Sequence, residues 1–470
     1  MVQAGERIHV IGIAGSGAAG AALLMQLAGA RVDGCDIDTP SPYTPALDSG
    51  GISYVKGHDP AHLAGVDRVA ITPALHAVPD HPELSAATDR GIPIATWQHI
   101  LGELMAGPGH IGLAVTGTHG KSTTTALLGH LLVAAGLDPT VEVGAFIGAW
   151  EASVRPGHGA PFLVEADEFG DNFLSYHPAA AIVTNVEMDH PDYFADAAAV
   201  MASFERFVRG MAGHPALNGR LLLAAAGDPG ADELVKRLND WGGRILRYGP
   251  GGDVWAIEVE LESDVTRFTL FDYRFEMTLA GEHNVLNATA AIVLARTLGA
   301  DLALLADGLR TFAGAGRRME LIADTAAVTI YDDYGHHPTE VRAALAAARQ
   351  KVGRDRRLWA VFEPHMYSRT ALLMDAFATS FTDADEVVIA DIFASRDTPE
   401  AMASTSAEAL ADAIERTSAV PAIATGDVES TTEYVADHVG HGDAVLVMGA
   451  GKSYRIARAL ADRMAGAARP

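Results

Sequence analysis

A phosphate-binding loop is the clearest chemical pattern in this sequence of 470 residues. A strand-like run, 111–116, ends in a glycine-rich turn, and an apolar helix-like run, 121–135, follows it. Such a turn lets backbone N–H groups surround phosphate oxygens, and the helix amino terminus adds positive potential. In this pattern the lysine contacts the β- and γ-phosphates of ATP and the serine ligates Mg²⁺. The predicted nucleotide-binding residues are Gly117, Thr118, His119, Gly120, Lys121, Ser122 and Thr123.

This loop departs from the full phosphate-loop pattern because Val115 stands where the outer glycine belongs. The loop alone does not choose between a kinase, an ATPase, a GTPase and a ligase. The residues that follow the next strands must decide.

Carboxylates and a histidine follow two further predicted strands. Glu165-Ala166-Asp167-Glu168 ends the run 161–165, and three carboxylates there would repel each other unless a cation sits among them. Mg²⁺ takes oxygen ligands and neutralises phosphate charge, so the acidic strand end favours a magnesium site. His190, after the run 180–185, stands between an acid and a proline in a tight turn, which indicates a functional position.

A second glycine loop follows the first predicted strand, 7–13. Its backbone suits a diphosphate, and Asp36 follows at the spacing of a ribose-binding acid. A dehydrogenase is disfavoured, because it leaves the phosphate loop and the last third of the chain unexplained. The residues of this loop are Gly12, Ala14, Gly15, Ser16 and Gly17.

The elements that must position these residues alternate between strands and helices. This predicts an α/β protein of three domains: a Rossmann-like domain at 1–107, a central P-loop ATPase-like domain with a mixed sheet at 108–314, and a C-terminal Rossmann-like domain at 315–470. Residues 244–280 alternate and indicate an antiparallel portion. The third domain shows strand-like runs at 327–332, 357–362, 386–391 and 444–449.

Composition restricts the class of protein. The formal net charge of −26 argues against nucleic-acid binding, and we expect no signal peptide and no membrane span. The single cysteine, Cys35, excludes an intramolecular disulfide, fits a reducing cytoplasm and is predicted to be a small buried residue.

Taken together, the motifs resemble those of the Mur ligase family, in the family's order and over nearly the whole chain. The motifs are GTHGKSTTT, EADE, TNVEMDHPDYF, GEHNVLN (281–287), RR (317–318), DDYGHHPTE (332–340), EPHMYSRT (363–370) and MGAGKSY (448–454). This conjunction is far more specific than any single motif.

The resemblance implies an ATP- and Mg²⁺-dependent ligase of peptidoglycan precursor synthesis. It would join L-alanine to the lactyl carboxylate of UDP-N-acetylmuramate through an acyl phosphate, in the cytoplasm, as a monomer or homodimer. No enzyme nucleophile is needed, because the carboxylate is activated by phosphoryl transfer and then attacked by a neutral amine. His190, His336 and His337 are open candidates for the base that deprotonates the amine.

The resemblance also carries over residue roles. Catalytic roles fall on Lys121, Glu165, His190, His336 and Arg369, and metal binding on Ser122, Glu165 and His190. Further nucleotide contacts fall on His283, Asn284, Asn287, Arg317, Asp332 and Tyr334, with Asp333 in the same motif. Substrate binding falls on the N-terminal glycine loop with Asp36, His58 and Thr72, the last within Thr72-Pro73-Ala74.

Two positions depart from the family pattern. Met366 stands where some members have a second arginine, and Glu363 stands where glutamine is common. Glycine or L-serine therefore stays open beside L-alanine, since a pocket separates small side chains by only about 1–3 kcal/mol. Two other functions stay open: a recycling ligase that attaches a whole tripeptide, and a catalytically silent nucleotide-binding scaffold.

Overall fold

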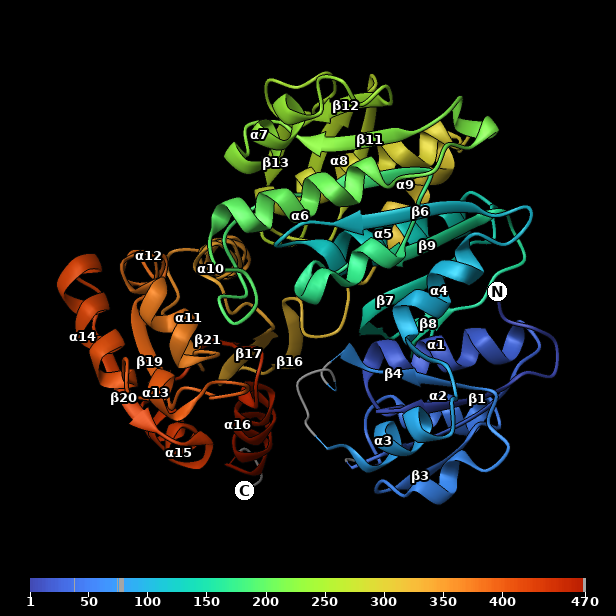
Figure 1. Cartoon of the computed structure of the whole chain (residues 1–470). Coiled ribbons are helices and arrows are strands. Elements are labelled where there is room, and N and C mark those ends of the chain that lie inside the picture. The colour runs from blue at the N-terminus through green and yellow to red at the C-terminus, as the bar shows by residue number, and fades with distance from the viewer. Residues whose placement is uncertain (38, 74, 76–79, 468–470) are drawn as a thin grey trace. The chain divides into compact units, whose positions relative to one another are not determined.

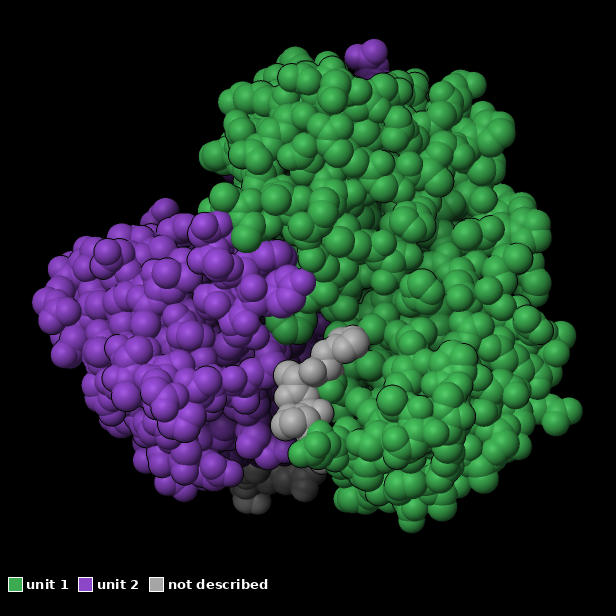
Figure 2. Space-filling view, viewed as in Figure 1, with its two compact units in different colours: residues 1–187, 197–255, 286–311 green, residues 188–196, 256–285, 312–470 purple. Residues whose placement is uncertain are grey.

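The computed structural model describes residues 1–37, 39–73, 75 and 80–467, and the chain forms two compact units. Unit 1 comprises residues 1–187, 197–255 and 286–311, and unit 2 comprises residues 188–196, 256–285 and 312–470 (Figure 2). The chain therefore leaves unit 1 and returns to it twice.

The N-terminal part of unit 1 is built on a five-stranded sheet, blue in Figure 1. The strands are parallel and run in the order β3-β2-β1-β4-β5, the arrangement of a doubly wound half. They span Ser53–Lys56, Arg31–Asp36, Arg7–Ile11, Arg68–Ile71 and Ile94–Thr96. The helical segments are α1 (Ser16–Leu27), α2 (Thr44–Ser49), η1 (Pro60–Leu63), α3 (Pro82–Asp89) and α4 (Trp97–Met105).

A seven-stranded sheet forms the rest of the unit 1 core. Its order is β12-β11-β10-β6-β9-β7-β8, and only the edge pair β7–β8 is antiparallel. The strands are Arg244–Tyr248, Leu221–Ala225, Ala180–Val183, Ile111–Thr116, Pro161–Glu165, Thr140–Ile147 and Ala152–Arg155. The helical segments are α5 (Lys121–Ala134), η3 (Phe169–Ser175), α6 (Ala197–Arg209), η4 (Pro215–Leu217), α7 (Pro229–Arg237), α8 (Glu282–Thr297), which crosses from unit 2, and α9 (Leu302–Thr311).

The two sheets of unit 1 are joined by helix α1, which packs on β7 and β8. The approach is close: a Cβ added at Gly20 would lie 3.2 Å from the Val154 side chain. Ser153 Oγ also donates to the Ser16 carbonyl over 2.7 Å. The small residues of α1 therefore allow this helix to pack closely against the seven-stranded sheet.

Unit 2 is built on a six-stranded sheet in the order β16-β17-β21-β18-β19-β20. Only β16 is antiparallel to its neighbour. The strands are Glu320–Asp324, Val328–Asp333, Asp443–Met448, Leu358–Phe362, Glu386–Ala390 and Ala422–Gly426. The helices are α10 (Pro338–Val352), α11 (Tyr367–Leu372), α12 (Met374–Ala378), α13 (Pro399–Met402), α14 (Ala407–Ser418), α15 (Val428–His438) and α16 (Ser453–Ala467). Apolar clusters on both faces bury its central strands.

The predicted α/β class with a mixed central sheet is confirmed. The antiparallel portion expected within 244–280 is confirmed as the sheet β13 (Ile257–Leu261), β14 (Thr266–Leu270) and β15 (Tyr273–Met277), whereas β12 pairs parallel with β11. The boundaries at 107/108 and 314/315 stay predictions. Among the described residues no helix is long and apolar enough to cross a membrane.

Candidate active site

The phosphate loop connects β6 to α5 in unit 1. Gly117 has a φ of +136°, and a Cβ there would lie 2.1 Å from Thr184 Oγ1. Gly120 has a φ of +79°, and its Cβ would lie 3.0 Å from Asn287 Oδ1. Both positions combine a left-handed backbone with a close neighbour, so glycine is required at each.

The segment after β10 fixes the backbone of this loop. Thr184 Oγ1 donates to the His119 carbonyl over 2.5 Å, and Asn185 Oδ1 accepts from the His119 N–H over 2.7 Å. The Glu187 N–H donates to Thr118 Oγ1 over 2.8 Å. The predicted loop residues Thr118 and His119 are therefore held by a second strand end.

Lys121 begins α5 and is held by carboxylates. Its Nζ lies 2.7 Å from Glu168 Oε2 and 3.5 Å from Asp167 Oδ1, and it donates to the Gly117 carbonyl over 2.7 Å. Burial lowers the pKa of Lys121, but the charges of Glu168 and Asp167 outweigh it, so the pKa is raised and the ammonium stays charged. Glu168, one of the three carboxylates of the acidic strand end, is 1% exposed and contacts Lys121 directly.

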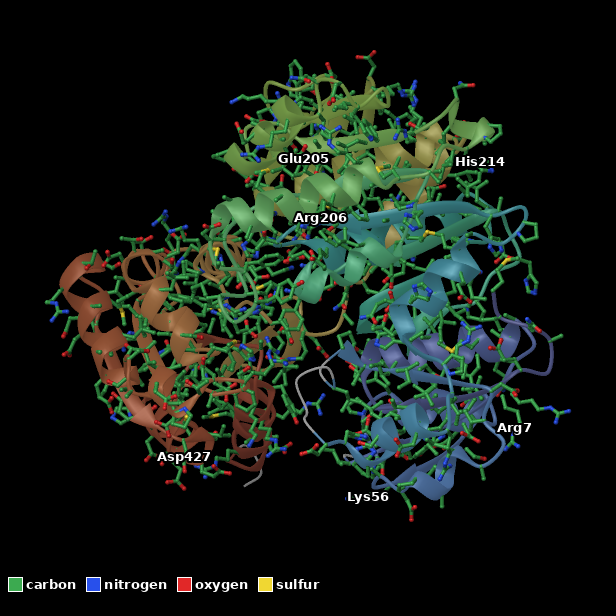
Figure 3. The ribbon with its side chains drawn as sticks, viewed as in Figure 1. Arg7, Lys56, Glu205, Arg206, His214 and Asp427 are labelled. Atoms are coloured by element: carbon green, nitrogen blue, oxygen red, sulfur yellow. The ribbon has the colours of Figure 1, made fainter. Side chains whose placement is uncertain are left out.

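Segment η3 is tied to helix α6, which stabilises the acidic strand end before it. Arg206 on α6, labelled in Figure 3, donates to Asp171 Oδ2 over 2.6 Å. The Asp171 N–H in turn donates to the Glu168 carbonyl over 3.0 Å. These contacts therefore hold the backbone of Glu168, whose carboxylate faces Lys121.

Ser122 and Glu165 form a pair of oxygen ligands. Ser122 Oγ donates to Glu165 Oε1 over 2.9 Å, while Glu165 Oε2 accepts from the Gly144 N–H over 2.7 Å. Adjacent ligands of an octahedral Mg²⁺ ion at 2.0–2.1 Å lie about 2.9 Å apart, so the spacing of these two oxygens fits that ion. The structure thus brings together two of the three predicted metal ligands.

Glu142 on β7 is a buried acid that sequence reasoning missed. It is 1% exposed, and burial together with the charge of Glu165 raises its pKa well above the usual value. Burial thus favours the protonated form of Glu142 beside the Ser122–Glu165 pair. The available signal was a single acid inside the apolar run 140–147.

In unit 2, Arg369 and Asp189 form a buried ion pair. Arg369 Nε and Nη2 each lie 2.7 Å from Asp189 Oδ1, and the two residues are 1% and 5% exposed. Burial raises the pKa of Asp189, but the charges of His190 and Arg369 outweigh it and hold the pKa well below its usual range. Asp189 was not predicted as a site residue, and it engages the guanidinium predicted to face the amino acid.

His190 follows Asp189 in a left-handed turn. Its φ is +54°, and its carbonyl accepts the N–H groups of Tyr193 and Phe194, each over 2.9 Å. The tight turn predicted from Asp189-His190-Pro191 is confirmed. Its catalytic and metal-binding roles stay predictions.

His336 is held as a neutral imidazole. Its Nδ1 lies 3.0 Å from the Tyr334 carbonyl, which can only accept, so Nδ1 carries the proton and Nε2 is a proton acceptor. Burial, opposed by Glu340 and assisted by Arg369, lowers the pKa of His336 to about 4. The His365 ring lies 5.8 Å away, and Arg369 Nη1 lies 3.1 Å from His365 Nδ1. His336, His365 and Arg369 thus form one cluster.

The predicted C-terminal nucleotide residues gather around Tyr334. Arg317 lies 5.0 Å from the Tyr334 ring centroid and Arg318 lies 5.2 Å from it. Arg317 Nε donates to Asp332 Oδ2 over 2.9 Å, and Asp333 accepts from the Met319 and Gly335 N–H groups. The cluster combines a flat ring with two cations, which suits an anionic aromatic ligand.

The two departures from the family pattern are structural positions. Glu363 Oε2 accepts from the Ser453 N–H over 2.8 Å and so caps the amino terminus of α16. Met366 is fully buried, with a φ of +72°, and precedes α11. Neither side chain is presented as a surface group.

The three predicted residues of α8 do not share one environment. Asn287 lies against Gly120 in unit 1, whereas Asn284 Nδ2 donates to the Ala280 carbonyl over 2.8 Å in unit 2. Burial and the charge of Arg318 lower the pKa of His283 to about 4. Spacings of three and four residues make Asn284 and His283 neighbours of Asn287 along the helix, and only their packing partners differ.

The N-terminal glycine loop opens α1 at the carboxyl edge of the five-stranded sheet. Gly12 has a φ of +83°, and a Cβ there would lie 2.7 Å from Thr72 Cγ2, so Thr72 faces the loop. Asp36 Oδ2 accepts from the Ala14 N–H over 2.9 Å. His58 Nδ1 lies 3.0 Å from Glu83 Oε2, and Ala74 lies outside the described residues.

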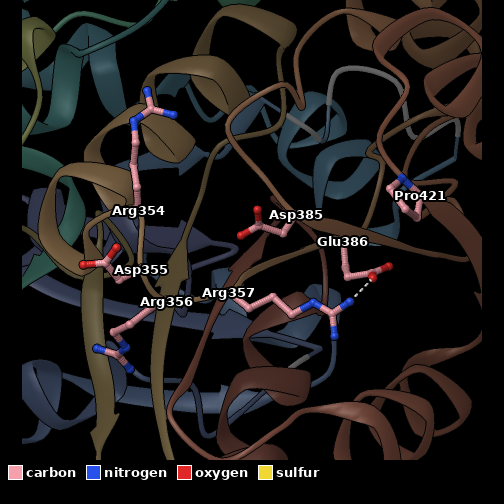
Figure 4. Close-up of a pocket in the computed structure, with 7 residues that line it drawn as sticks. All are labelled: Arg354, Asp355, Arg356, Arg357, Asp385, Glu386 and Pro421. Atoms are coloured by element: carbon pink, nitrogen blue, oxygen red, sulfur yellow. Dashed lines mark hydrogen bonds and ion pairs between the residues drawn. The ribbon is translucent and has the colours of Figure 1, made fainter.

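A hollow of about 480 Å³ lies elsewhere in unit 2. It is lined by Arg354, Asp355, Arg356, Arg357, Asp385, Glu386 and Pro421 (Figure 4). These residues stand at the amino ends of β18, β19 and β20, and Arg357 pairs with Glu386. Ligands of open α/β sheets bind at the carboxyl ends of strands, so this hollow is separate from the candidate site.

Comparison with known proteins follows the chain in three segments. Residues 7–108 match the Mur ligase family catalytic domain, residues 162–295 the Mur ligase middle domain and residues 317–451 the Mur ligase glutamate ligase domain. A UDP-N-acetylmuramate–L-alanine ligase of Acidothermus cellulolyticus is 37% identical over 452 residues, covering 95% of this chain and 92% of that protein. One of Kineococcus radiotolerans is 40% identical over 411 residues, covering 84% and 83%.

Solved structures agree with these matches. A UDP-N-acetylmuramate-alanine ligase of Thermotoga maritima has a TM-score of 0.80 at 25% identity, covering 98% of this chain and 99% of that one. A murein peptide ligase of Psychrobacter arcticus has a TM-score of 0.68 at 26% identity, covering 97% and 99%.

Proposed function

The chain belongs to the Mur ligase family, and we propose that it joins L-alanine to the lactyl carboxylate of UDP-N-acetylmuramate, with ATP converted to ADP and phosphate. The observation that carries the proposal is the phosphate loop of unit 1, where Ser122 Oγ and Glu165 Oε1 stand 2.9 Å apart beside the Lys121 ammonium. The relatives with the stated alanine-ligase names cover most of the chain and support the substrate pair.

The phosphate loop supplies the charge that phosphoryl transfer needs. Lys121 would lie along the β- and γ-phosphates, and Ser122, Glu165 and His190 would hold Mg²⁺, which neutralises phosphate charge when bound. A carboxylate oxygen attacks the γ-phosphorus, the bond to ADP breaks, and the resulting acyl phosphate carries a good leaving group. The protein contributes position and charge, not a covalent nucleophile.

We propose that two groups of residues bind the base end of the nucleotide. Asn287 supports Gly120 of the loop, and Arg317, Asp332 and Tyr334 form the cationic aromatic cluster of unit 2. His283 and Asn284, on the first turn of α8, complete this assignment.

The amine must lose a proton before it attacks the acyl carbon. His336 offers a neutral imidazole whose Nε2 can accept that proton, because its Nδ1 is bound to a carbonyl. Attack forms the amide bond and releases phosphate. Arg369 contacts His365 and Asp189 in the same cluster as His336. We therefore propose that Arg369 positions the groups that face the amino acid.

The UDP diphosphate falls to the glycine loop that opens α1. The residues of this loop are Gly12, Ala14, Gly15, Ser16 and Gly17, while Asp36 is proposed to lie near the uridine and Thr72 and His58 on the substrate side. We propose that the enzyme acts in the cytoplasm, where nucleotide sugars and ATP are found; whether it is a monomer or a homodimer stays a prediction.

Two other functions are less well supported. The murein peptide ligase of Psychrobacter arcticus favours a recycling ligase by fold, but its TM-score of 0.68 is below the 0.80 of the alanine-type structure. A silent scaffold is disfavoured, because the phosphate loop has its lysine and the Ser122 and Glu165 oxygens lie at the spacing of adjacent Mg²⁺ ligands.

Phosphate release by the purified protein tests the proposal. The protein is given ATP, Mg²⁺ and UDP-N-acetylmuramate, with L-alanine, glycine, L-serine or the tripeptide added singly. Release that requires the UDP-sugar and L-alanine is expected. Release with the tripeptide alone would establish a recycling ligase, and ATP binding without release for any amine would favour the scaffold. Lys236→Met, at a surface lysine of unit 1, is the control for Lys121→Met.

A further inference from the structure

A group of metal-binding side chains is buried on one face of the five-stranded sheet, on the N-terminal half of unit 1. His9 lies on β1, Cys35 on β2, His62 in η1 and Glu83 in the first turn of α3. One ligand atom from each of the four lies within 4.8 Å of the others. The proposed ligase reaction uses none of these four residues.

The strand register explains why they meet. β1 and β2 pair in parallel with Ile11 opposite Cys35 and His9 opposite Asp33, so the side chains of His9, Asp33 and Cys35 project from the same face. Segment η1 and helix α3 contact each other over this face and bring His62 and Glu83 to it. His9, Cys35 and Glu83 are each 2% exposed or less.

Three of the distances match a tetrahedral ion. His9 Nε2 lies 3.4 Å from Cys35 Sγ and 3.6 Å from Glu83 Oε1, and Cys35 Sγ lies 3.4 Å from that same oxygen. In a zinc tetrahedron with bonds of about 2.0–2.3 Å, neighbouring ligand atoms lie roughly 3.3–3.6 Å apart. These three atoms therefore form one face of such a tetrahedron.

His62 supplies the fourth corner from the more exposed side. Its Nδ1 lies 2.7 Å from Glu83 Oε1, which is a hydrogen-bond distance. Coordination of both atoms to one ion would lengthen this contact by about half an ångström, to the tetrahedral spacing. His62 is 24% exposed, so its ring has room to move and an ion has a route in.

His9 is oriented as zinc-bound histidines are. Its Nδ1 lies 2.5 Å from Asp33 Oδ1, which leaves Nε2 turned to Cys35 and Glu83. A carboxylate on the far ring nitrogen fixes the tautomer and raises the basicity of the ligating nitrogen.

Two further histidines, His58 and His81, lie beside these ligands. His81 is 5% exposed, and among the described residues neither of its ring nitrogens has a hydrogen-bond partner. Its ring lies 4.4 Å from that of His58, whose Nδ1 lies 3.0 Å from Glu83 Oε2.

We propose that His9, Cys35, His62 and Glu83 bind a divalent transition-metal ion of the zinc class, with Asp33 orienting His9. Thiolate and imidazole ligands select such ions over Mg²⁺, which prefers oxygen ligands alone. Binding displaces the proton of the Cys35 thiol, which leaves the thiolate, and the proton on His9 Nε2, because both atoms must be deprotonated to act as ligands. The site is structural, because all four ligands come from protein.

This site has a direct link to the glycine loop. The Cys35 carbonyl accepts the Gly12 N–H over 2.8 Å and the Ile13 N–H over 3.2 Å. An ion that fixes the Cys35 side chain therefore also fixes the end of β2, to which the backbone of the glycine loop is hydrogen-bonded.

Cobalt titration of the full-length protein, first freed of metal by chelation, tests the proposal. Cobalt bound by a thiolate gives a charge-transfer band in the near ultraviolet, and Cys35 is the one cysteine of the chain, so the band has a single possible source. We expect one cobalt per chain with this band, displacement by zinc, and a higher melting temperature with zinc.

Three variants separate the outcomes. Cys35→Ser should lose the band, and His62→Gln, at a partly exposed position, should weaken binding at least tenfold without unfolding the chain. His99→Gln, a 60%-exposed histidine of the same sheet system, is the matched control and should bind as the wild type. Cobalt bound without the band, or binding unchanged in His62→Gln, would overturn the proposal. None of these measurements depends on ligase activity.

Discussion

Replacing Arg369 with methionine should open unit 2 selectively, because it removes one partner of a buried ion pair. Two guanidinium nitrogens lie 2.7 Å from Asp189 Oδ1, and both residues are almost completely buried. Charges about 4 Å apart at an effective dielectric constant of about 20 attract by roughly 4 kcal/mol. Removal of one partner from a buried pair costs about 3–5 kcal/mol, in agreement. We therefore expect Arg369→Met to lower the free energy of unfolding of unit 2 by about 4 kcal/mol.

Hydrogen exchange followed by mass spectrometry is the suitable assay, since a chain of two compact units does not unfold in a single step. A loss of about 4 kcal/mol lowers protection of core amides roughly 10³-fold. The loss should appear in peptides of β17, β18 and β21, while peptides of β6 and β9 in unit 1 keep their protection and serve as the internal reference.

A matched surface pair provides the control. Arg357 lies 2.6 Å from Glu386, but its side chain is 51% exposed, so Arg357→Met should cost about 0–1 kcal/mol. Asp189→Asn combined with Arg369→Met should cost less than the sum of the two single changes, by about 3 kcal/mol. If Arg369→Met loses no more protection than Arg357→Met, or the two changes are additive, the buried pair does not stabilise unit 2 as argued.

Three further predictions concern the phosphate loop, the metal ligands and acid stability. Lys121→Met should lower phosphate release about 10²-fold or more, because phosphate charge is no longer neutralised, and turnover within threefold of the Lys236→Met control would contradict this. Glu165→Gln should shift the Mg²⁺ concentration for half-maximal rate upward about tenfold, whereas an unchanged titration would remove Glu165 from the ion. Burial and Arg318 lower the pKa of His283 from 6.5 to about 4. Between these two pH values the unfolded chain binds a proton at His283 that the folded chain does not. The contribution of neutral His283 to the free energy of unfolding is therefore fully present above about pH 6.5 and is lost as the pH falls toward 4. His283→Gln should therefore reduce the acid-induced loss of unit 2 stability by about 2 kcal/mol in urea unfolding at a pH of about 4.5, and equal losses in variant and wild type would refute the assignment.

The buried parallel strands could be predicted from the sequence, because such strands are apolar along their whole length. The runs 111–116 and 161–165 coincide with β6 and β9 to the residue. The phosphate loop was equally predictable, because a strand, a glycine turn and a helix start are local features. Glycines at 117 and 120 stand where the backbone is left-handed, as the turn requires.

Contacts between distant segments could not be predicted in the same way. Asp189 and Arg369 are 180 residues apart, and no periodicity indicates which arginine a turn acid will meet. The allocation of 256–285 to unit 2 depends on packing such as the Gly281 N–H donating to Gln350 Oε1 over 2.7 Å, which is also invisible in composition. The zinc-class cluster depends on the register of β1 against β2, since a slip by one residue would turn Cys35 to the other face.

The contacts of Lys121 show what the phosphate loop must exchange when a nucleotide binds. The ammonium is bound to Glu168 and to two loop carbonyls, so its charge is compensated before any phosphate arrives. Phosphate must replace at least the contact between Lys121 and Glu168. The binding free energy gained is therefore the difference between the lysine–phosphate and lysine–Glu168 ion pairs. In the loose transition state, negative charge develops on the oxygen that leaves with ADP, and this charge competes better for the lysine than the ground-state nucleotide does. Glu168→Gln should consequently tighten ATP binding while lowering the maximal rate, since the lysine would then hold the ground state as readily as the transition state. An isothermal titration with ATP and a single-turnover rate measure these two quantities separately. Weaker ATP binding in Glu168→Gln would show instead that the carboxylate positions Lys121 for the phosphates.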